Sequence, residues 1–302
     1  MDKRINFLFV LIITIVVCVG IVIGVVCGTL LFDLQFSKGN GAESTPSSSD
    51  TEDSDTTDSG QTTSSGTKPE DPMPKKKIAL TFDDGPHVKN TQEVLDLLEQ
   101  YGAKATFFVC GNRLNEITGP VLRRAISLGC EIGNHTYTHA YMTDLSKQEL
   151  LKEILDTNRK ITELSGTDYQ CRFYRPPGGK INRKSMETLY ENEIYMYSIF
   201  WSSDSRDWDY QSQYKNGKIT RKTAIEKAFN TIVDETSEGT VILMHDIHEI
   251  TPDLLKLVLE KYTSEGYAFV TVSELFGFEE DVGDKESYFM RYRSPGSILP
   301  QK

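Results

Sequence analysis

The chain has 302 residues and a formal net charge of −11, and its length allows one domain of roughly 200 residues with further segments beside it. Eight acidic residues and one lysine lie between residues 39 and 74, so most of the negative charge belongs there and the rest of the chain is only mildly acidic. This distribution argues against a nucleic-acid partner, and the odd number of cysteines beyond the N-terminal segment excludes a fully paired disulfide framework.

An apolar run opens the chain. Residues 7–32 follow Lys3 and Arg4, and these 26 residues exceed both the ~20 that span a bilayer and the ~15 of a signal-peptide core. No small-x-small cleavage site follows, so we expect an uncleaved transmembrane signal anchor with residues 1–6 in the cytoplasm. Residues 33–74 are rich in Ser, Thr and acidic side chains without apolar periodicity, which predicts a disordered linker outside the cell membrane.

From residue 75 onward, short apolar runs alternate with amphipathic stretches. The apolar runs predict seven strands, at 77–82, 105–110, 131–133, 172–174, 194–200, 240–244 and 268–271. Apolar spacings of three and four predict helices near 94–101, 121–128, 150–161, 220–233 and 254–262. Ser146 and Glu149 form a capping box before the third helix, and Thr251 is the expected N-cap of the last.

This alternation predicts an α/β fold in which helices lie outside a parallel sheet. About seven parallel strands over residues 75–278 suggest a distorted (β/α) barrel, and an open doubly wound sheet is the alternative that the pattern leaves. The periodicity fades over residues 279–302, which we expect to form an irregular tail. Cys110 and Cys130 adjoin neighbouring strands, so they either form one bridge or pack as small buried hydrophobes.

Two adjacent carboxylates end the first expected strand. Asp83 and Asp84 follow its apolar run, and Gly85 and Pro86 then turn the chain. In α/β proteins the carboxyl ends of strands carry the chemistry, and two close negative charges require a cation or a basic partner nearby. An ordinary surface turn is the competing interpretation, because these are the commonest turn residues.

His135 and His139 lie four residues apart, directly after the expected strand at 131–133. On a helical turn this spacing points both imidazoles at one position, as two ligands of one metal require. With one carboxylate from the first strand they would form a three-ligand site with open positions, which is typical of a catalytic divalent metal. A pair of polar surface residues is the alternative.

Three further stretches place candidate site residues after expected strands. Arg175 precedes two prolines and two glycines, which suits a fixed guanidinium aimed at a carboxylate, and Gly178 permits close backbone approach to a ligand. Asp204, Asp207 and Trp208 follow another expected strand, and an aromatic beside carboxylates is a common sugar platform. His245 ends a buried strand, in a position for a general acid or base. Ordinary loop and core roles are the alternatives for each stretch.

Together these stretches resemble a known family. TFDDGP, HTYTH, RPPGG, DSRDW and LMHD occur in the order and separations of the polysaccharide deacetylases with a NodB-type domain, carbohydrate esterase family four. The resemblance covers roughly residues 75–277, and it implies a distorted (β/α) barrel with metal-dependent N-deacetylase activity. Many members carry an aromatic where this chain has Gly178, so one wall of the sugar groove is expected to be absent.

The resemblance also implies a role for each motif residue. The implied metal ligands are Asp84, His135 and His139. The implied catalytic residues are Asp83 as base, Arg175 as the arginine that orients it, His245 as acid and Asp207 as the carboxylate that tunes the acid. The implied substrate-binding residues are Gly178, through its backbone N–H, and Trp208 and Leu243, which line an acetyl pocket.

A membrane-anchored member of this family implies a cell-wall polymer as substrate. N-acetylglucosamine of peptidoglycan is the first expectation, followed by N-acetylmuramic acid and a poly-N-acetylglucosamine exopolysaccharide. Zinc is the expected cofactor, and cobalt, nickel or manganese also suit two imidazoles and a carboxylate. A non-catalytic wall-binding ectodomain is the alternative of another class. Beyond the glycan and the membrane, neither nucleic acid nor protein is expected as a partner.

Overall fold

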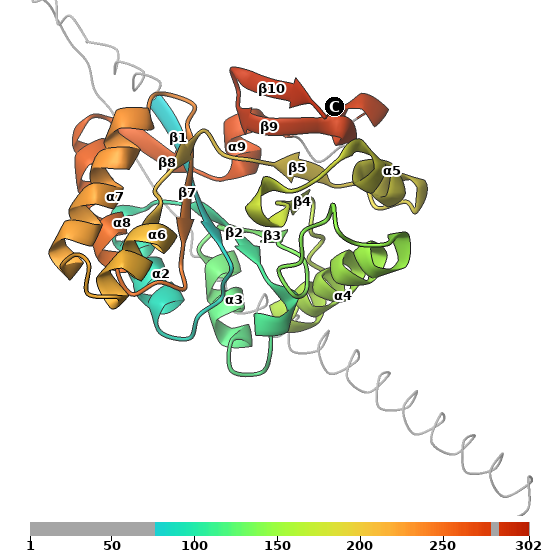
Figure 1. The fold of residues 1–302 in the computed structure, drawn as a ribbon, viewed down its shortest axis with the longest axis horizontal. Coiled ribbons are helices and arrows are strands. Elements are labelled where there is room, and N and C mark those ends of the chain that lie inside the picture. The colour runs from blue at the N-terminus through green and yellow to red at the C-terminus, as the bar shows by residue number, and fades with distance from the viewer. Residues whose placement is uncertain (1–75, 279–283, 302) are drawn as a thin grey trace, which may run out of the picture. The chain divides into compact units, whose positions relative to one another are not determined.

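The computed structural model describes residues 76–278 and 284–301 (Figure 1). Its strands are β1 (Lys76–Asp83), β2 (Ala105–Val109), β3 (Glu131–Asn134), β4 (Phe173–Tyr174), β5 (Tyr197–Ile199), β6 (Ser203–Asp204), β7 (Val241–His245), β8 (Tyr267–Val270), β9 (Met290–Ser294) and β10 (Ser297–Pro300). Its helices are α2 (Asn90–Tyr101), α3 (Gly119–Ser127), α4 (Lys147–Ser165), α5 (Arg183–Glu191), α6 (Asp207–Lys215), α7 (Arg221–Glu235), α8 (Thr251–Ser264) and α9 (Val272–Phe276). Short 3₁₀ helices occur at η1 (Gly111–Arg113), η2 (Pro177–Gly179) and η3 (Lys285–Phe289).

The strands of the described residues join one sheet. Their order is β10-β9-β5-β4-β3-β2-β1-β7-β6, and β8 pairs with the first half of β1. Every pair is parallel except the β9–β10 hairpin. No pairing joins β10 to β6 within 76–278 and 284–301, so the sheet is a curled, open half-barrel rather than a closed barrel (Figure 1). The expected α/β class is confirmed.

β1 occupies the centre of this arrangement. Its residues from Ile78 to Asp83 are buried, because β2 and β7 flank the strand and both of its faces are covered. Since the neighbouring strands are parallel, the carboxyl ends of β1, β2, β3, β4 and β7 meet at the same edge of the sheet. This edge receives the loops that carry the candidate site residues.

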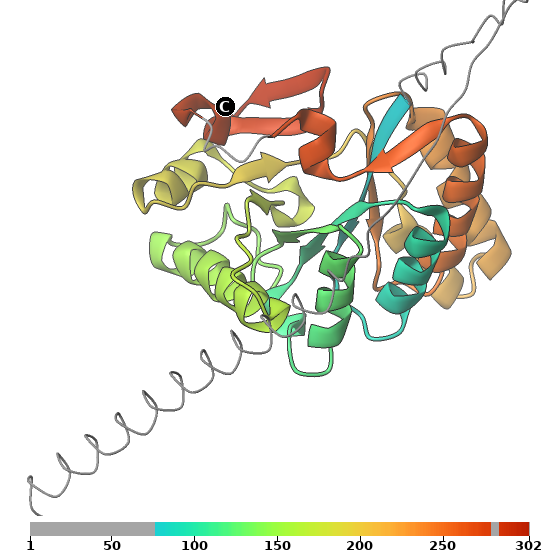
Figure 2. The ribbon, with the colours of Figure 1, turned by 180° about the vertical axis from the view of Figure 1, so that it is seen from behind.

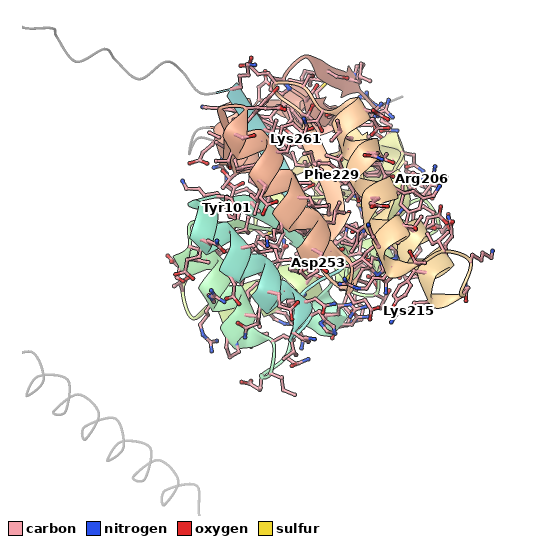
Figure 3. The ribbon with its side chains drawn as sticks, turned by 90° about the vertical axis from the view of Figure 1, so that its left-hand side faces the viewer. Tyr101, Arg206, Lys215, Phe229, Asp253 and Lys261 are labelled. Carbon is pink, nitrogen blue, oxygen red and sulfur yellow. The ribbon has the colours of Figure 1, made fainter. Side chains whose placement is uncertain are left out.

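Two apolar cores hold the helices against the sheet. The larger core packs β1, β2 and β7 against α2, α3, α7 and α8. Figure 3 shows α2, α8 and α7 side by side on this side of the molecule, with Tyr101 on α2, Asp253 on α8 and Phe229 on α7. The second core joins β4 and β5 to α4, α5 and the C-terminal hairpin, which extends the sheet beyond β5 (Figure 2).

The seven strands expected from the sequence are all present in the described residues, as is the capping box that opens α4. β6, β9 and β10 have no counterpart in the expectations. The irregular tail expected for 279–302 is wrong over the described part, 284–301, where η3 and the β9–β10 hairpin form. The physical reason is burial, because Phe289 and Tyr292 fill the second core.

Several expectations concern residues outside the described ranges: the cytoplasmic residues 1–6, the transmembrane anchor 7–32 and the linker 33–74. Among the residues that the structure does describe, no helix combines the length and apolar character needed to cross a membrane. The bridge considered for Cys110 and Cys130 is not formed, and both are buried free thiols.

Candidate active site

β1 ends in two carboxylates that approach one imidazole. Asp83 Oδ2 lies 3.6 Å and Asp84 Oδ1 lies 3.4 Å from Nε2 of His135. Asp84 has a left-handed backbone conformation, with φ of 76°, so it leaves the strand alternation that would send its side chain to the opposite face. Asp83 is only 3% exposed, which excludes the ordinary surface turn.

Both histidines reach Asp84 from the loop that follows β3. Nε2 of His135 and Nε2 of His139 lie 3.4 and 3.3 Å from Asp84 Oδ1, and the ring centroids are 5.1 Å apart. The expected helical turn is wrong, because this loop has no helical residue and turns through left-handed conformations at Thr136 and His139. The expected convergence of the two imidazoles is nevertheless present.

The protonation of this cluster follows from its hydrogen bonds. Nδ1 of His135 lies 2.7 Å from the backbone oxygen of Arg175, which can only accept, so Nδ1 carries the hydrogen and the lone pair of Nε2 faces Asp84. Burial lowers the pKa of His135 in spite of the nearby carboxylates and favours the neutral ring. Asp84 Oδ1 is buried without a hydrogen-bond partner among the described residues. Asp84, His135 and His139 therefore offer one oxygen and two nitrogens that fit a divalent cation.

Arg175 fixes the position of Asp83. Its guanidinium is fully buried, and Nη1 donates to Asp83 Oδ1 at 2.8 Å and to Thr81 Oγ1 at 2.9 Å. Nε and Nη2 donate to the backbone oxygens of Ile199 and Phe200. Burial lowers the pKa of Arg175, against the opposing effect of Asp83, but an arginine stays protonated in proteins. The pair therefore occupies one oxygen of Asp83 and leaves the other oxygen facing the histidine cluster.

Asp207 holds His245 at the end of β7. Nδ1 of His245 lies 2.7 Å from Asp207 Oδ1, while Asp207 Oδ2 accepts hydrogen bonds at 2.8 Å from the His245 backbone N–H and from Oγ1 of Thr251. Thr251 is thus not the N-cap of α8, which is Ile250. Burial opposes the charged imidazole, but the charge and hydrogen bond of Asp207 outweigh it and raise the pKa of His245 to about 9. His245 is therefore protonated near neutral pH.

Comparisons with known proteins show which family this chain resembles. A family model described as polysaccharide deacetylase matches residues 70–197. A Listeria monocytogenes protein named peptidoglycan-N-acetylglucosamine deacetylase PgdA is 37% identical over 223 residues, which cover 73% of this chain and 43% of that relative. The solved structure of a family 4 acetyl xylan esterase from Clostridium thermocellum in complex with a cobalt ion has a TM-score of 0.60 and 33% identity, over 72% of this chain and 98% of that one. The chain belongs to the polysaccharide deacetylase family.

A second relative carries a different substrate in its name. The Bacillus subtilis protein named peptidoglycan-N-acetylmuramic acid deacetylase PdaC is 36% identical over 201 residues, which cover 67% of this chain and 39% of that relative. The chain therefore spans about two fifths of the length of the Listeria and Bacillus relatives.

The expected substrate-binding residues of this chain lie close to the two buried ion pairs. Trp208 follows Asp207, is 49% exposed and donates its backbone N–H to Asp207 Oδ1 at 2.9 Å. Leu243 is buried in β7 two residues before His245, so both point to the same side of the strand. Gly178 lies in η2 with a left-handed φ of 57°, a conformation that glycine adopts without strain.

Two buried residues of the site have no role assigned from the sequence. Thr81 accepts a hydrogen bond from Arg175 and donates one to the backbone oxygen of Ile242 at 2.6 Å. It precedes Asp83 by two residues on β1, so strand alternation was the signal that could have found it. Asp246 is fully buried, and a Cβ on Gly85 would lie 2.4 Å from its carboxylate oxygens. Burial raises the pKa of Asp246 to about 7, and no local pattern reveals that burial.

Proposed function

We propose that this chain is a metal-dependent hydrolase that removes N-acetyl groups from cell-wall polysaccharide, with N-acetylglucosamine of peptidoglycan as substrate and acetate as product. One observation carries the proposal. The cluster of Asp84, His135 and His139 lies beside two buried ion pairs, Asp83–Arg175 and Asp207–His245. Amide hydrolysis is helped by a Lewis acid that polarises the carbonyl, by a general base and by a general acid. A metal held by the cluster could supply the first, and the two ion pairs could supply the base and the acid. The names of the Listeria and Bacillus relatives support peptidoglycan as the substrate class.

Asp84, His135 and His139 are the proposed metal ligands. The fit rests on the buried oxygen of Asp84, which has no hydrogen-bond partner in residues 76–278 and 284–301, and on the lone pair that His135 directs toward it. Two imidazoles and a carboxylate suit zinc, with cobalt, nickel or manganese as alternatives, and the C. thermocellum esterase structure contains cobalt. When bound, the metal would polarise the amide carbonyl and lower the pKa of a bound water toward about 7.

Asp83 is the proposed general base. Arg175 binds Asp83 Oδ1, so Oδ2 is the oxygen left to accept the proton of the attacking water. Arg175 also compensates the buried negative charge, which would otherwise be costly. Its further hydrogen bonds to Thr81 and to two backbone oxygens keep the guanidinium, and with it the carboxylate, in one orientation.

His245 is the proposed general acid. Nδ1 is engaged with Asp207, so Nε2 carries the hydrogen that can pass to the nitrogen of the departing amine. The raised pKa keeps this proton available at neutral pH. Asp207 is itself buried, and burial raises its pKa. The charge and hydrogen bonds of His245 outweigh this effect, so the pKa of Asp207 is lowered overall and the carboxylate stays ionised. The products are acetate and a free amino sugar.

The remaining residues are proposed to bind the acetamido group. The backbone N–H of Gly178 would stabilise the carbonyl oxygen as negative charge develops on it. Trp208 and Leu243 would line the acetyl pocket, where Leu243 supplies an apolar contact on the same side of β7 as His245.

The first test is acetate release from purified peptidoglycan by the full chain, after chelation and again after addition of zinc or cobalt. We expect chelation to abolish release and a metal to restore it, while an Asp84→Asn variant stays inactive with either metal. Analysis of the product sugars then distinguishes glucosamine from muramic acid, which the Bacillus relative's name makes the second candidate.

Failure has two distinguishable forms. Release from poly-N-acetylglucosamine but not from peptidoglycan would overturn the substrate and retain the reaction. Absence of release from both polymers with every metal would overturn the enzyme and favour the non-catalytic wall-binding ectodomain.

We also propose that the catalytic domain lies outside the cell membrane, facing the cell wall. The support is the apolar run at 7–32 after a basic N-terminus and the acidic, polar segment at 33–74. Protease added to intact cells with a permeabilised wall should remove the domain and spare an N-terminal epitope. Cleavage that requires membrane lysis would overturn this orientation.

A further inference from the structure

The ring of Tyr141 covers Gly178. Tyr141 lies in the loop after β3, two residues beyond His139, whereas Gly178 lies in η2 after β4. A Cβ built on Gly178 would come within 3.2 Å of Tyr141 Cε1 and 3.6 Å of Cζ. The aromatic ring therefore occupies the space directly above this glycine, where any other side chain at position 178 would begin.

The same ring is open to solvent. Tyr141 is 44% exposed. A flat aromatic ring that is open to solvent offers an apolar face on which a ligand can pack. Cε1 and Cζ are the ring atoms nearest to that Cβ position, and the exposed part of the ring is available to a ligand.

Tyr141 and Trp208 stand on opposite sides of the proposed catalytic centre. Tyr141 and Gly178 follow β3 and β4, and Trp208 follows β6. In the strand order β4-β3-β2-β1-β7-β6, the carboxylates at the end of β1 lie between them. An exposed aromatic side chain thus stands on each side of the position where an acetamido group would react.

We propose that Tyr141 is a specificity-determining sugar platform, whose ring stacks on the apolar face of a pyranose next to the sugar being deacetylated. The proposal rests on the proposed N-deacetylase function. The proposal implies that the substrate is an oligosaccharide rather than a single sugar, because the catalytic centre and the Tyr141 platform would contact different sugar rings.

The test is the kinetics of the full chain and its Tyr141→Ala variant on the N-acetylglucosamine tetramer. Loss of the ring should raise KM about tenfold, equivalent to about 1.4 kcal/mol, with kcat within about twofold, since the ring does not contact the reacting amide. Tyr141→Phe, which keeps the ring, should retain the parent KM. Tyr141→Leu, which keeps apolar volume without a flat ring, should behave as the alanine variant.

The matched control is Tyr195→Ala. Tyr195 is equally exposed at 44%, but it precedes β5 and contacts Tyr190 and Tyr288 at the opposite edge of the sheet. Its loss should leave KM unchanged. Thermal unfolding and metal content of each variant separate a platform defect from a folding defect.

A binding measurement separates this proposal from the proposed function. In the Asp83→Asn background, calorimetry with the tetramer should give a Kd about tenfold weaker without the Tyr141 ring. Turnover by the parent chain with unchanged KM and Kd in Tyr141→Ala and Tyr141→Leu would overturn the platform alone. Ring-dependent binding of the tetramer without acetate release from the tetramer or from peptidoglycan would overturn the deacetylase and retain the platform. Failure of the parent chain to bind the tetramer would overturn the platform, and acetate release from peptidoglycan would then retain the deacetylase.

Discussion

Asp83 of β1 and His245 of β7 occupy paired positions in the parallel register of these two strands. Neighbouring strands lie about 4.8 Å apart, so the register alone brings the proposed base and acid to adjacent points of one edge. Each residue has its own buried partner of opposite charge, Arg175 for Asp83 and Asp207 for His245. The two partners explain how a carboxylate and an imidazolium can act side by side as base and acid.

The Asp207–His245 pair predicts a pH dependence. The pKa of His245 is raised to about 9, so the acid is protonated below this pH and activity should fall as pH rises through it. In Asp207→Asn the burial that lowers this pKa remains and the charge that raises it is lost. The alkaline limb of kcat/KM should therefore move down by at least about two pH units, toward or below 6.5. The control is Asp209→Asn in the same turn of α6, which should leave the limb in place.

Asp83→Asn should lower kcat by at least about a hundredfold, because an amide cannot accept the proton of the attacking water. Its shape is nearly unchanged, so metal content measured by mass spectrometry should match that of the parent chain. Asp84→Asn should instead lose metal, because an amide is a much weaker ligand than a carboxylate. An active Asp83→Asn enzyme would show that another group is the base.

Arg175→Met should destabilise the fold by about 3–5 kcal/mol, because it leaves the Asp83 carboxylate buried without its positive partner. The free energy of unfolding in urea measures this loss. Adding Asp83→Asn should recover part of it, since the uncompensated charge is removed. Arg183→Met breaks an exposed pair with Glu187 and should cost less than about 1 kcal/mol. Equal effects of the two arginine variants would contradict the buried-pair account.

The C-terminal hairpin should contribute measurably to stability. Tyr292 is buried in the second core, so Tyr292→Ala should lower the free energy of unfolding by about 3 kcal/mol through lost burial and a residual cavity. Leu299→Ala on the neighbouring strand β10, where the side chain is 40% exposed, should cost less than about 1 kcal/mol. A hairpin that added nothing would leave both variants as stable as the parent chain.

The sequence predicted the buried strands well, since each is a short apolar run with turn residues at its ends. β9 was not predicted, because Met290 and Tyr292 alternate with two arginines over only five residues. This segment is too short and too polar for its alternation to be recognised as a strand. The helical turn assigned to His135 and His139 failed for a related reason. Spacing of four residues fits a helix, but the loop reaches the same convergence through left-handed residues that the sequence does not mark.

The candidate site likewise contains residues that the sequence indicates and contacts that it does not indicate. Asp83, Asp84, His135, His139, Arg175, Asp207 and His245 could all be named as candidates, because each lies after an expected strand and carries a side chain suited to acid–base or metal chemistry. Their separate roles were implied by the family resemblance of the five motifs. The partnership of Thr251 with Asp207 could not be named. It depends on the approach of α8 to the start of α6, which no local pattern encodes.

By itself, the sequence determined the α/β alternation and the chemical types at the strand ends, because these depend on residues close together in the chain. Only the tertiary structure decided that the sheet stays open, that Thr251 donates to Asp207 and that Tyr141 covers Gly178. These relationships are set by strand order, register and burial. The contacts between distant residues arise from packing between elements. The same packing places Asp207 against His245 and so raises the His245 pKa, as the proposed acid chemistry requires.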